Sequence, residues 1–249
     1  MKRKLNYDPS MDKLSSDEIK LLERASNSIK TFVEKSTIIN HTNYRTRDAH
    51  ATPYCSLLGT FSVYNNFEEH NLFPIGSTDC IIRISNPHMK LVSQKRTIPT
   101  YGFSLKIFNN QETILNLPMV NFPLFPIVNI SRFLKIFTAL NHFFSGGFLQ
   151  KFWQSVKILK NTIAVRPGFF HPSFITEAIR FIIQWKRFIL SFNYHSIGAY
   201  RLGEHIVKYK LVPLSVPSQS TENTIDQSIE DYLSNHNYEL ELMVSIVTT

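Results

Sequence analysis

Residues 79–85 read Asp79-Cys80-Ile81-Ile82-Arg83-Ile84-Ser85, a run in which β-branched residues are interrupted by polar ones and which ends before Asn86-Pro87. This composition, closed by turn-forming residues, is typical of a strand. Two further runs, Gly59–Tyr64 and Tyr101–Phe108, have the same texture and are also followed by polar residues where the chain can turn. Short strands joined by turns predict an antiparallel sheet or barrel between His50 and Phe125.

A helix is predicted before the sheet. Ser15-Ser16-Asp17-Glu18 has the form of a capping box, in which a serine and a glutamate satisfy each other's backbone N–H groups. Apolar residues then recur at helical spacing up to about Ser36, namely Ile19, Leu22, Ala25, Ile29, Phe32 and Val33. We expect this helix to pack on the outside of a core or against a partner subunit.

The remainder of the chain alternates between helical and strand texture. The predicted order is basic and apolar helices over about 131–192, a strand at Tyr200–Leu211, a linker at Pro213–Ser220, a short acidic helix at Ile225–Leu233 and a last strand at Tyr238–Val247. The chain is therefore predicted to be α+β. We expect an N-terminal helical arm at 1–43 and a barrel domain at 44–249, with a helical insertion at about 131–195 between the two halves of the barrel.

Charge and composition limit the partners. With 43% hydrophobic residues the chain can bury a core, and its net charge of +8 favours an anionic partner, whether nucleic acid, an anionic membrane surface or a ligand with carboxylates. Nucleic acid is not expected, because the basic residues are dispersed among apolar helices and no nucleic-acid motif is present. The first residues are basic but lack the apolar stretch of a secretory signal, so we expect a cytoplasmic location.

The helices over 131–192 have two interpretations. No run reaches membrane-spanning length without a charge. The helices can cover a core, with their lysines and arginines extending to water. They can also dock on a membrane surface through basic and aromatic side chains.

Three polar side chains lie in or beside strand-like segments: His50, Ser85 and Asn121. Each has an ordinary structural role to weigh against a functional one. A histidine is more often a hydrogen-bonding residue than a catalyst, Ser85 shares a strand face with Arg83, and Asn121 could form a turn before Phe122-Pro123. Cys55 and Cys80, the only cysteines, have no zinc-ligand or disulfide spacing, and we expect both to be buried thiols.

At these positions the chain resembles the catalase superfamily, specifically its shorter catalase-like haem proteins. The resemblance extends from about Tyr44 to the C-terminus. It rests on Arg47-x-x-His50-Ala51, Gly59-Thr60-Phe61-Ser62-Val63, Arg83-x-Ser85, Tyr101-Gly102-Phe103-x-x-Lys106 and Asn121-x-Pro123-x-Phe125. It implies a haem cofactor and a peroxide substrate.

The resemblance also implies catalytic roles. His50 would be the distal acid–base residue, Ser85 the hydroxyl that orients its imidazole, and Asn121 the amide that hydrogen-bonds the peroxide. A neutral imidazole over the iron can take a proton from one peroxide oxygen and deliver it to the other.

The cofactor-binding residues implied by the resemblance are Arg47, Arg83 and Phe125. The two arginines would meet the haem carboxylates, because a guanidinium makes paired hydrogen bonds to such groups. Phe125 would contact the haem or belong to the core.

The chain departs from the family in two places. Thr52-Pro53-Tyr54-Cys55 stands where the family often has glycines. In the family a tyrosinate from an R-x-x-x-Y segment binds the iron, after the last barrel strands. By order along the chain, the two C-terminal strands match the start of the barrel's second half, so we expect an incomplete barrel, a shortened C-terminus and no identified metal ligand. Tyr200, beside Arg201, belongs by order to a strand and is not assigned.

Two functional hypotheses follow. The first is a catalase-like, haem-dependent peroxidase acting on hydrogen peroxide or on an organic or lipid hydroperoxide. The second is a catalytically inactive, shortened catalase-like protein that binds haem or lipid and associates with membranes. A homo-oligomer and a peripheral membrane contact are left open as partners, and so is whether the chain is an enzyme.

Overall fold

The computed structural model describes residues 4–65, 73, 75–93, 99–109, 112–125, 127, 129–184, 187–215 and 224–248. The strands are β1 (Pro53–Val63), β2 (Gly76–Ser85), β3 (Gly102–Asn109), β4 (Glu112–Val120), β5 (Tyr194–Ser196), β6 (Tyr200–Leu202), β7 (His205–Pro213) and β8 (Leu240–Ile246). The α-helices are α1 (Ser16–Asn40), α2 (Ile130–Ser145), α3 (Phe148–Phe169), α4 (Pro172–Gln184) and α5 (Ile225–Asn235), and two 3-10 helices are η1 (Pro9–Asp12) and η3 (Ile189–Ser191).

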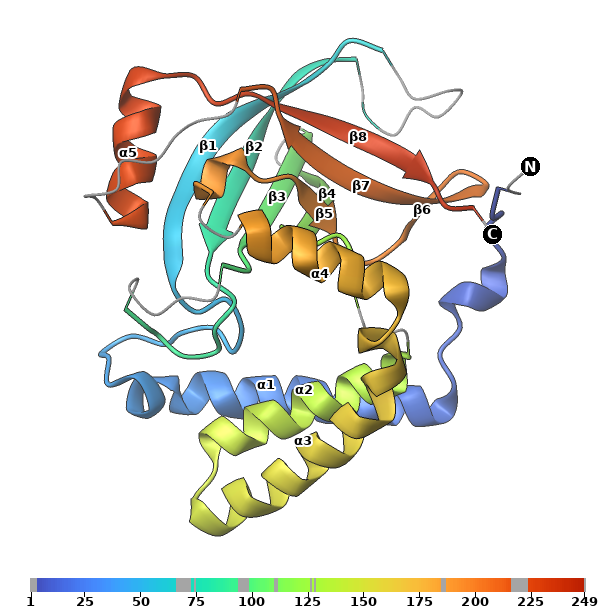
Figure 1. The fold of residues 1–249 in the computed structure, drawn as a ribbon, viewed down its shortest axis with the longest axis vertical. Helices are drawn as coiled ribbons and strands as arrows, with labels where there is room; N and C mark the ends of the chain where they lie inside the picture. Colours follow the sequence, from blue (N-terminus) through green and yellow to red (C-terminus); the bar gives the residue numbers. More distant parts are fainter. Residues whose placement is uncertain are drawn as a thin grey trace.

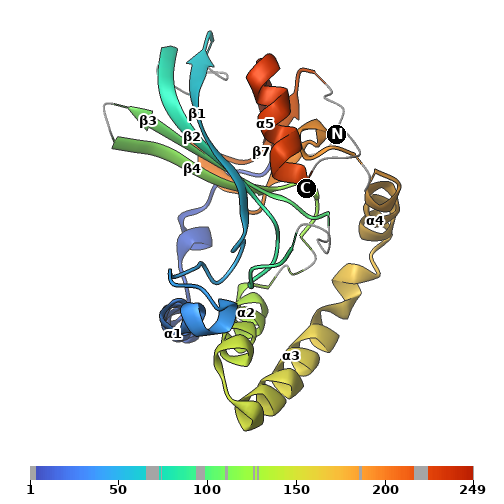
Figure 2. The ribbon, with the colours of Figure 1, turned by 90° about the vertical axis from the view of Figure 1, so that its left-hand side faces the viewer.

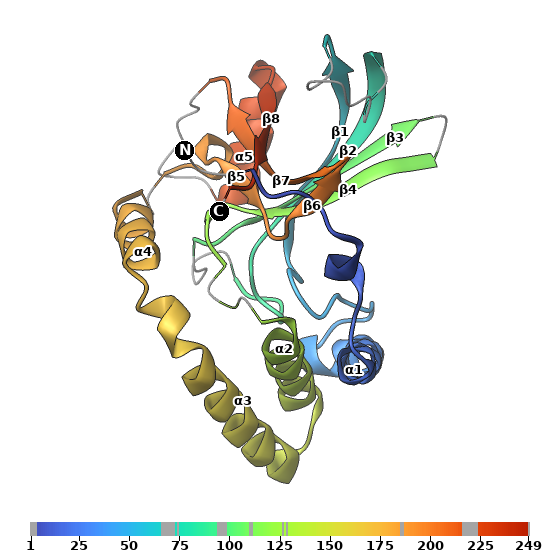
Figure 3. The ribbon, with the colours of Figure 1, turned by 90° about the vertical axis from the view of Figure 1, so that its right-hand side faces the viewer.

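The eight strands form one antiparallel sheet. β1 to β4 pair in sequence order, β4 continues through β5 to β7, β6 also pairs with β7, and β8 pairs with β7. Among the described residues β1 and β8 do not pair with each other, and Figure 3 shows the curved sheet open between them. The predicted α+β class and the incomplete barrel are therefore confirmed.

The three clearest predicted strands correspond to β1, β2 and β3, although Tyr64 lies just after β1 and Tyr101 just before β3. The single strand predicted over Tyr200–Leu211 is wrong, because two strands, β6 and β7, occupy this stretch and pair as a hairpin. The reversal occurs at Gly203, whose φ of +57° is a left-handed conformation that glycine adopts without steric cost. The predicted linker at Pro213–Ser220 lies largely outside the described residues.

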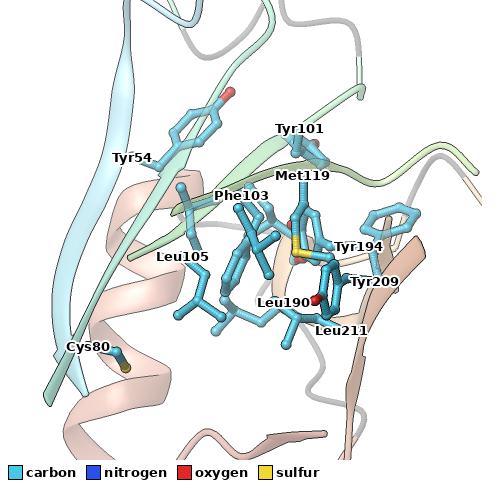
Figure 4. Close-up of a cluster of buried hydrophobic side chains, with 14 of the residues drawn as sticks. Tyr54, Cys80, Tyr101, Phe103, Leu105, Met119, Leu190, Tyr194, Tyr209 and Leu211 are labelled. Carbon is cyan, nitrogen blue, oxygen red and sulfur yellow. The ribbon is translucent and has the colours of Figure 1, made fainter. Parts of the chain in front are cut away.

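The core lies on the concave side of the sheet. Its fully buried side chains come from β2, β3, β4, β5, β7, η3 and α5, including Phe103, Met119, Leu190 and Tyr194. Figure 4 shows these aromatic and aliphatic groups in one cluster. The Tyr194 hydroxyl donates a hydrogen bond to the Ile189 carbonyl (2.8 Å), which makes its complete burial tolerable.

Three helices form a second layer below the sheet (Figure 1). α2 lies between α1 and α3, as Figures 2 and 3 both show. α1 begins with the predicted capping box, since Ser15 Oγ accepts from the Glu18 N–H (3.3 Å) and the Glu18 carboxylate accepts from the Ser15 N–H (2.9 Å). The predicted helix ends too early, because α1 continues to Asn40.

Candidate functional site

The register of the sheet brings three of the predicted site residues to one end of neighbouring strands. Ser85, the last residue of β2, lies opposite Gly102 at the start of β3, and Gly102 lies opposite Val120 at the end of β4. Asn121 follows Val120 directly, and His50 comes just before β1, whose Pro53 lies opposite Ser85. Residues up to 71 positions apart in the sequence are thereby placed at one edge of the sheet.

The helical layer anchors the loop that carries His50. The Thr46 N–H donates to Ser36 Oγ of α1 (2.8 Å), and Asn40 Nδ2 donates to Thr46 Oγ1 (2.7 Å). On the other side of the loop, Asn141 Nδ2 of α2 donates to the Asp48 carboxylate (3.2 Å). Side chains of α1 and α2 therefore fix where the loop enters β1.

His50 itself has an unusual backbone. Its φ of +53° is left-handed, a conformation that histidine, asparagine and aspartate adopt more readily than most residues. The conformation is held by two hydrogen bonds, from Arg83 Nη2 to the His50 carbonyl (2.7 Å) and from the Ala51 N–H to the His88 carbonyl (2.9 Å). The backbone conformation of His50 therefore sets the direction of its imidazole.

Gly102 provides the surface on which the imidazole rests. A Cβ atom at this position would lie 2.4 Å from Nδ1 and 2.5 Å from Cε1 of His50, closer than such atoms ever approach. Any other residue would therefore push the ring away. The resemblance included Tyr101-Gly102-Phe103 but gave Gly102 no role, although a glycine inside a strand pattern is itself a signal of close approach by another group.

Ser85 completes the surroundings of the ring. Its hydroxyl is buried and lies 3.3 Å from His50 Nδ1. Burial lowers the pKa of His50, the backbone carbonyl of Asn86 acts in the opposite direction, and the charges of Arg83 and Arg47 lower it further. The imidazole is consequently neutral at pH 7 and can accept a proton.

Asn121 is buried, and its side chain hydrogen-bonds to the segment just before β3. Its Oδ1 accepts from the Tyr101 N–H (2.7 Å), and its Nδ2 donates to the Pro99 carbonyl (2.9 Å). These bonds hold the segment that precedes Gly102, so Asn121 also supports the position of the His50 ring. A second hydrogen on Nδ2 is available by the chemistry of the amide.

The two predicted arginines differ in their surroundings. Arg83 uses its guanidinium on the His50 carbonyl, as described above, whereas the Arg47 side chain is exposed. The two charges are close enough for Arg47 to lower the pKa of Arg83. A cluster of two cations beside a neutral imidazole is a favourable place for a carboxylate.

Phe125 lies at the border of the helical layer. Its ring is 40% exposed and meets Phe133 of α2 edge-on, with 5.6 Å between centroids, and Phe133 stacks on Phe137. It is therefore an aromatic surface residue rather than part of the central core.

An ionised tyrosine is one of the side chains that can bind haem iron, and several tyrosines of the described residues have a pKa shifted away from ionisation. The tyrosines whose pKa departs from its usual value all have it raised, principally by burial except at Tyr7: Tyr7, Tyr101, Tyr194, Tyr200, Tyr209 and Tyr238. Tyr200 packs edge-on against Tyr209, and the neighbouring Arg201 lies over the Tyr7 ring instead. Nor do the described residues contain a group of three or more His, Cys, Asp or Glu side chains that could hold a metal ion.

The cysteines lie on β1 and β2, away from metal-binding chemistry. Cys80 is buried as predicted, whereas Cys55 is only partly buried. Burial raises the pKa of both thiols, that of Cys55 to about 11. At pH 7 both are protonated and therefore poor nucleophiles.

Comparisons with known proteins agree with this arrangement at the level of the fold. No family model and no curated protein matches the sequence. Among solved structures, catalase A from Saccharomyces cerevisiae matches with a TM-score of 0.52 and 16% identity over 99% of this chain. The fold is catalase-like. A second fungal catalase matches with a TM-score of 0.54 and 14% identity over all of this chain.

The chain spans about half the length of the catalases it matches, 51% and 49% of the two. At this level of identity the likeness concerns the fold alone. The comparisons therefore establish a catalase-like fold, and the roles of His50, Ser85 and Asn121 stay predictions.

Proposed function

We propose that the chain is a catalase-like haem protein in which His50 exchanges protons with a peroxide. The observation that supports this proposal most strongly is how the His50 imidazole packs against its neighbours. A neutral ring lies against the backbone at Gly102, a position where only glycine fits, with a buried hydroxyl at Nδ1.

The proposed roles are those that the resemblance to catalases implies, and the geometry is compatible with them. In the proposal the Ser85 hydroxyl, 3.3 Å from Nδ1, orients the ring, and Nε2 exchanges the proton. His50 accepts a proton from one peroxide oxygen and returns it to the other, so that water can leave. We assign to Asn121 the donation of its second amide hydrogen to the peroxide. Haem, when bound, supplies the iron at which the O–O bond is cleaved.

Arg47, Arg83 and Phe125 would hold the cofactor. The two cations would face its carboxylates, although Arg83 already bonds the His50 carbonyl, and Phe125 would contact its apolar rim. No residue is assigned as the iron ligand, for which a second copy in a homo-oligomer is one source. A cytoplasmic location belongs to the same proposal.

The proposal is tested by peroxide consumption. The haem-loaded chain is expected to consume hydrogen peroxide, or an organic or fatty-acid hydroperoxide, faster than the same concentration of free haem. Turnover should persist at neutral pH and fall on acidification with an apparent pKa below 6.5, because protonation removes the acceptor on His50 and the pKa of this ring is lowered. Turnover equal to that of free haem at every pH would contradict it.

A second function is favoured by the tyrosines. The surroundings of Tyr200 and Tyr209 raise the pKa of both, which does not favour an iron-binding tyrosinate at either position. On this alternative the catalase-like scaffold binds haem or another apolar ligand without turnover. It predicts saturable ligand binding together with the peroxide consumption of free haem.

A further inference from the structure

α3 exposes an apolar stripe on the side facing away from α2. The residues of this helix that are buried include Gln154 and Val165. The stripe consists of apolar residues spaced three and four positions apart along the helix. Their side chains are between 45% and 74% exposed: Leu149, Phe152, Val156, Leu159 and Ile163. Trp153, 62% exposed, lies beside it. An amphipathic helix normally buries such a stripe, so here it is presented to a partner.

α4 continues the same pattern. Its inner side chains Phe174 and Phe181 each meet Phe122 edge-on, with 5.4 Å between ring centroids. Three of its isoleucines, Ile179, Ile182 and Ile183, are more than half exposed. Figures 2 and 3 show α3 and α4 along the outer flank of the molecule, with α2 on their inner side.

The charged residues of α2, α3 and α4 are almost all positive. Residues 130–184 contain seven Lys and Arg residues and a single carboxylate, Glu177, so they carry most of the chain's net charge of +8. Glu177 is bonded to Arg180 (2.5 Å). α3 has no acidic residue, and its exposed cations are Lys151, Lys157, Lys160 and Arg166.

The exposed apolar stripe and the positive charge together distinguish between three kinds of partner. A second copy docking through the same face would bring two positive surfaces together, which is unfavourable. Nucleic acid would match the charge but would leave the aliphatic stripe without an apolar partner. A bilayer with anionic lipids matches both features, because the apolar side chains enter the boundary of the acyl chains while the lysines meet the headgroups.

We propose that α3, extended by α4, docks this protein on the surface of a membrane that contains anionic lipid. The helices would lie in the interface plane. In the part of the chain that the structure describes, no helix has the length and hydropathy needed to cross a bilayer. This proposal rests on exposed side chains and charge and does not depend on haem or on His50.

The test is flotation of the full chain, without haem, on vesicles of phosphatidylcholine alone and of phosphatidylcholine mixed with phosphatidylserine. Binding is expected only to the mixed vesicles and should weaken as salt is added. Joint substitution of Phe152→Ser and Trp153→Ser should reduce binding by at least about tenfold, since two large apolar groups no longer enter the interface. Lys157→Gln and Lys160→Gln should each reduce it roughly fivefold.

The matched control is the joint substitution Leu58→Ser on β1 and Tyr64→Ser just after it, where the side chains are 86% and 84% exposed. This variant removes exposed apolar area elsewhere and should bind as the unaltered chain does. Absence of binding to mixed vesicles, or equal losses in both pairs of variants, would overturn the proposal. So would a dimer in lipid-free solution that Phe152→Ser and Trp153→Ser dissociate, since the stripe would then belong to a second copy.

Discussion

Replacing His50 with asparagine is expected to lower peroxide turnover of the haem-loaded chain by about two to four orders of magnitude. Asparagine tolerates the left-handed backbone at this position, so the loop should keep its conformation. Its amide can still meet the Ser85 hydroxyl but cannot accept and return a proton at neutral pH. Haem affinity, measured in the same samples by absorption, should change little.

His41 provides the matched control for this substitution. It is the other described histidine with a left-handed φ, +52°, and it is exposed at the C-terminal end of α1. His41→Asn should therefore leave turnover and stability near those of the unaltered chain. If His50→Asn retained full turnover, His50 would not be the acid–base group. If it lost haem and turnover together, its role would be structural.

Replacing Gly102 with alanine is expected to displace the His50 ring. The added Cβ would overlap Nδ1 and Cε1, and Ser85 Oγ would lie 3.1 Å from it, so the ring must move away from the hydroxyl. The free energy of unfolding should fall by roughly 1–3 kcal/mol, the usual cost of forcing an extra methyl group into a packed site. Turnover should fall with it, because the imidazole is no longer aimed.

Two measurements separate displacement of the ring from general damage. Urea unfolding gives the loss of stability, and the NMR titration of His50 should show its pKa returning toward 6.5 as the ring becomes more exposed. Gly198→Ala is the control, because a Cβ there meets no atom within 4 Å. An unchanged His50 titration in Gly102→Ala would show that the ring does not rest on this glycine.

Much of the sheet could be predicted because its strands are short apolar and β-branched runs closed by turn residues. The runs Asp79–Ser85 and Tyr101–Phe108 have this composition, and they correspond to β2 and β3. The hairpin at Gly203 was missed because β6 is only three residues long. The alternation of apolar and polar residues over Tyr200–Leu211 continues across the turn and so resembles one long strand. A short strand and its partner cannot be told from one longer strand by periodicity alone.

The candidate site was predictable in its members but not in its assembly. His50, Ser85 and Asn121 could be named from the resemblance, whereas their proximity depends on the register of β2, β3 and β4, which sequence periodicity does not specify. The bond from Arg83 to the His50 carbonyl was not foreseen either, since it depends on the left-handed turn at His50. Gly102, a glycine inside a predicted strand, was the feature of the sequence that could have indicated close approach of another group, but it was given no role.

The most direct test of the account is a titration of the purified chain with ferric haem, followed in the Soret band and then repeated after peroxide is added. The account predicts a saturable band at a fixed stoichiometry that peroxide alters, because in the proposal the His50 ring, held against Gly102 and Ser85, would form part of the haem site. Only the broad spectrum of free or loosely adsorbed haem at every ratio, with no response specific to the protein, would contradict it.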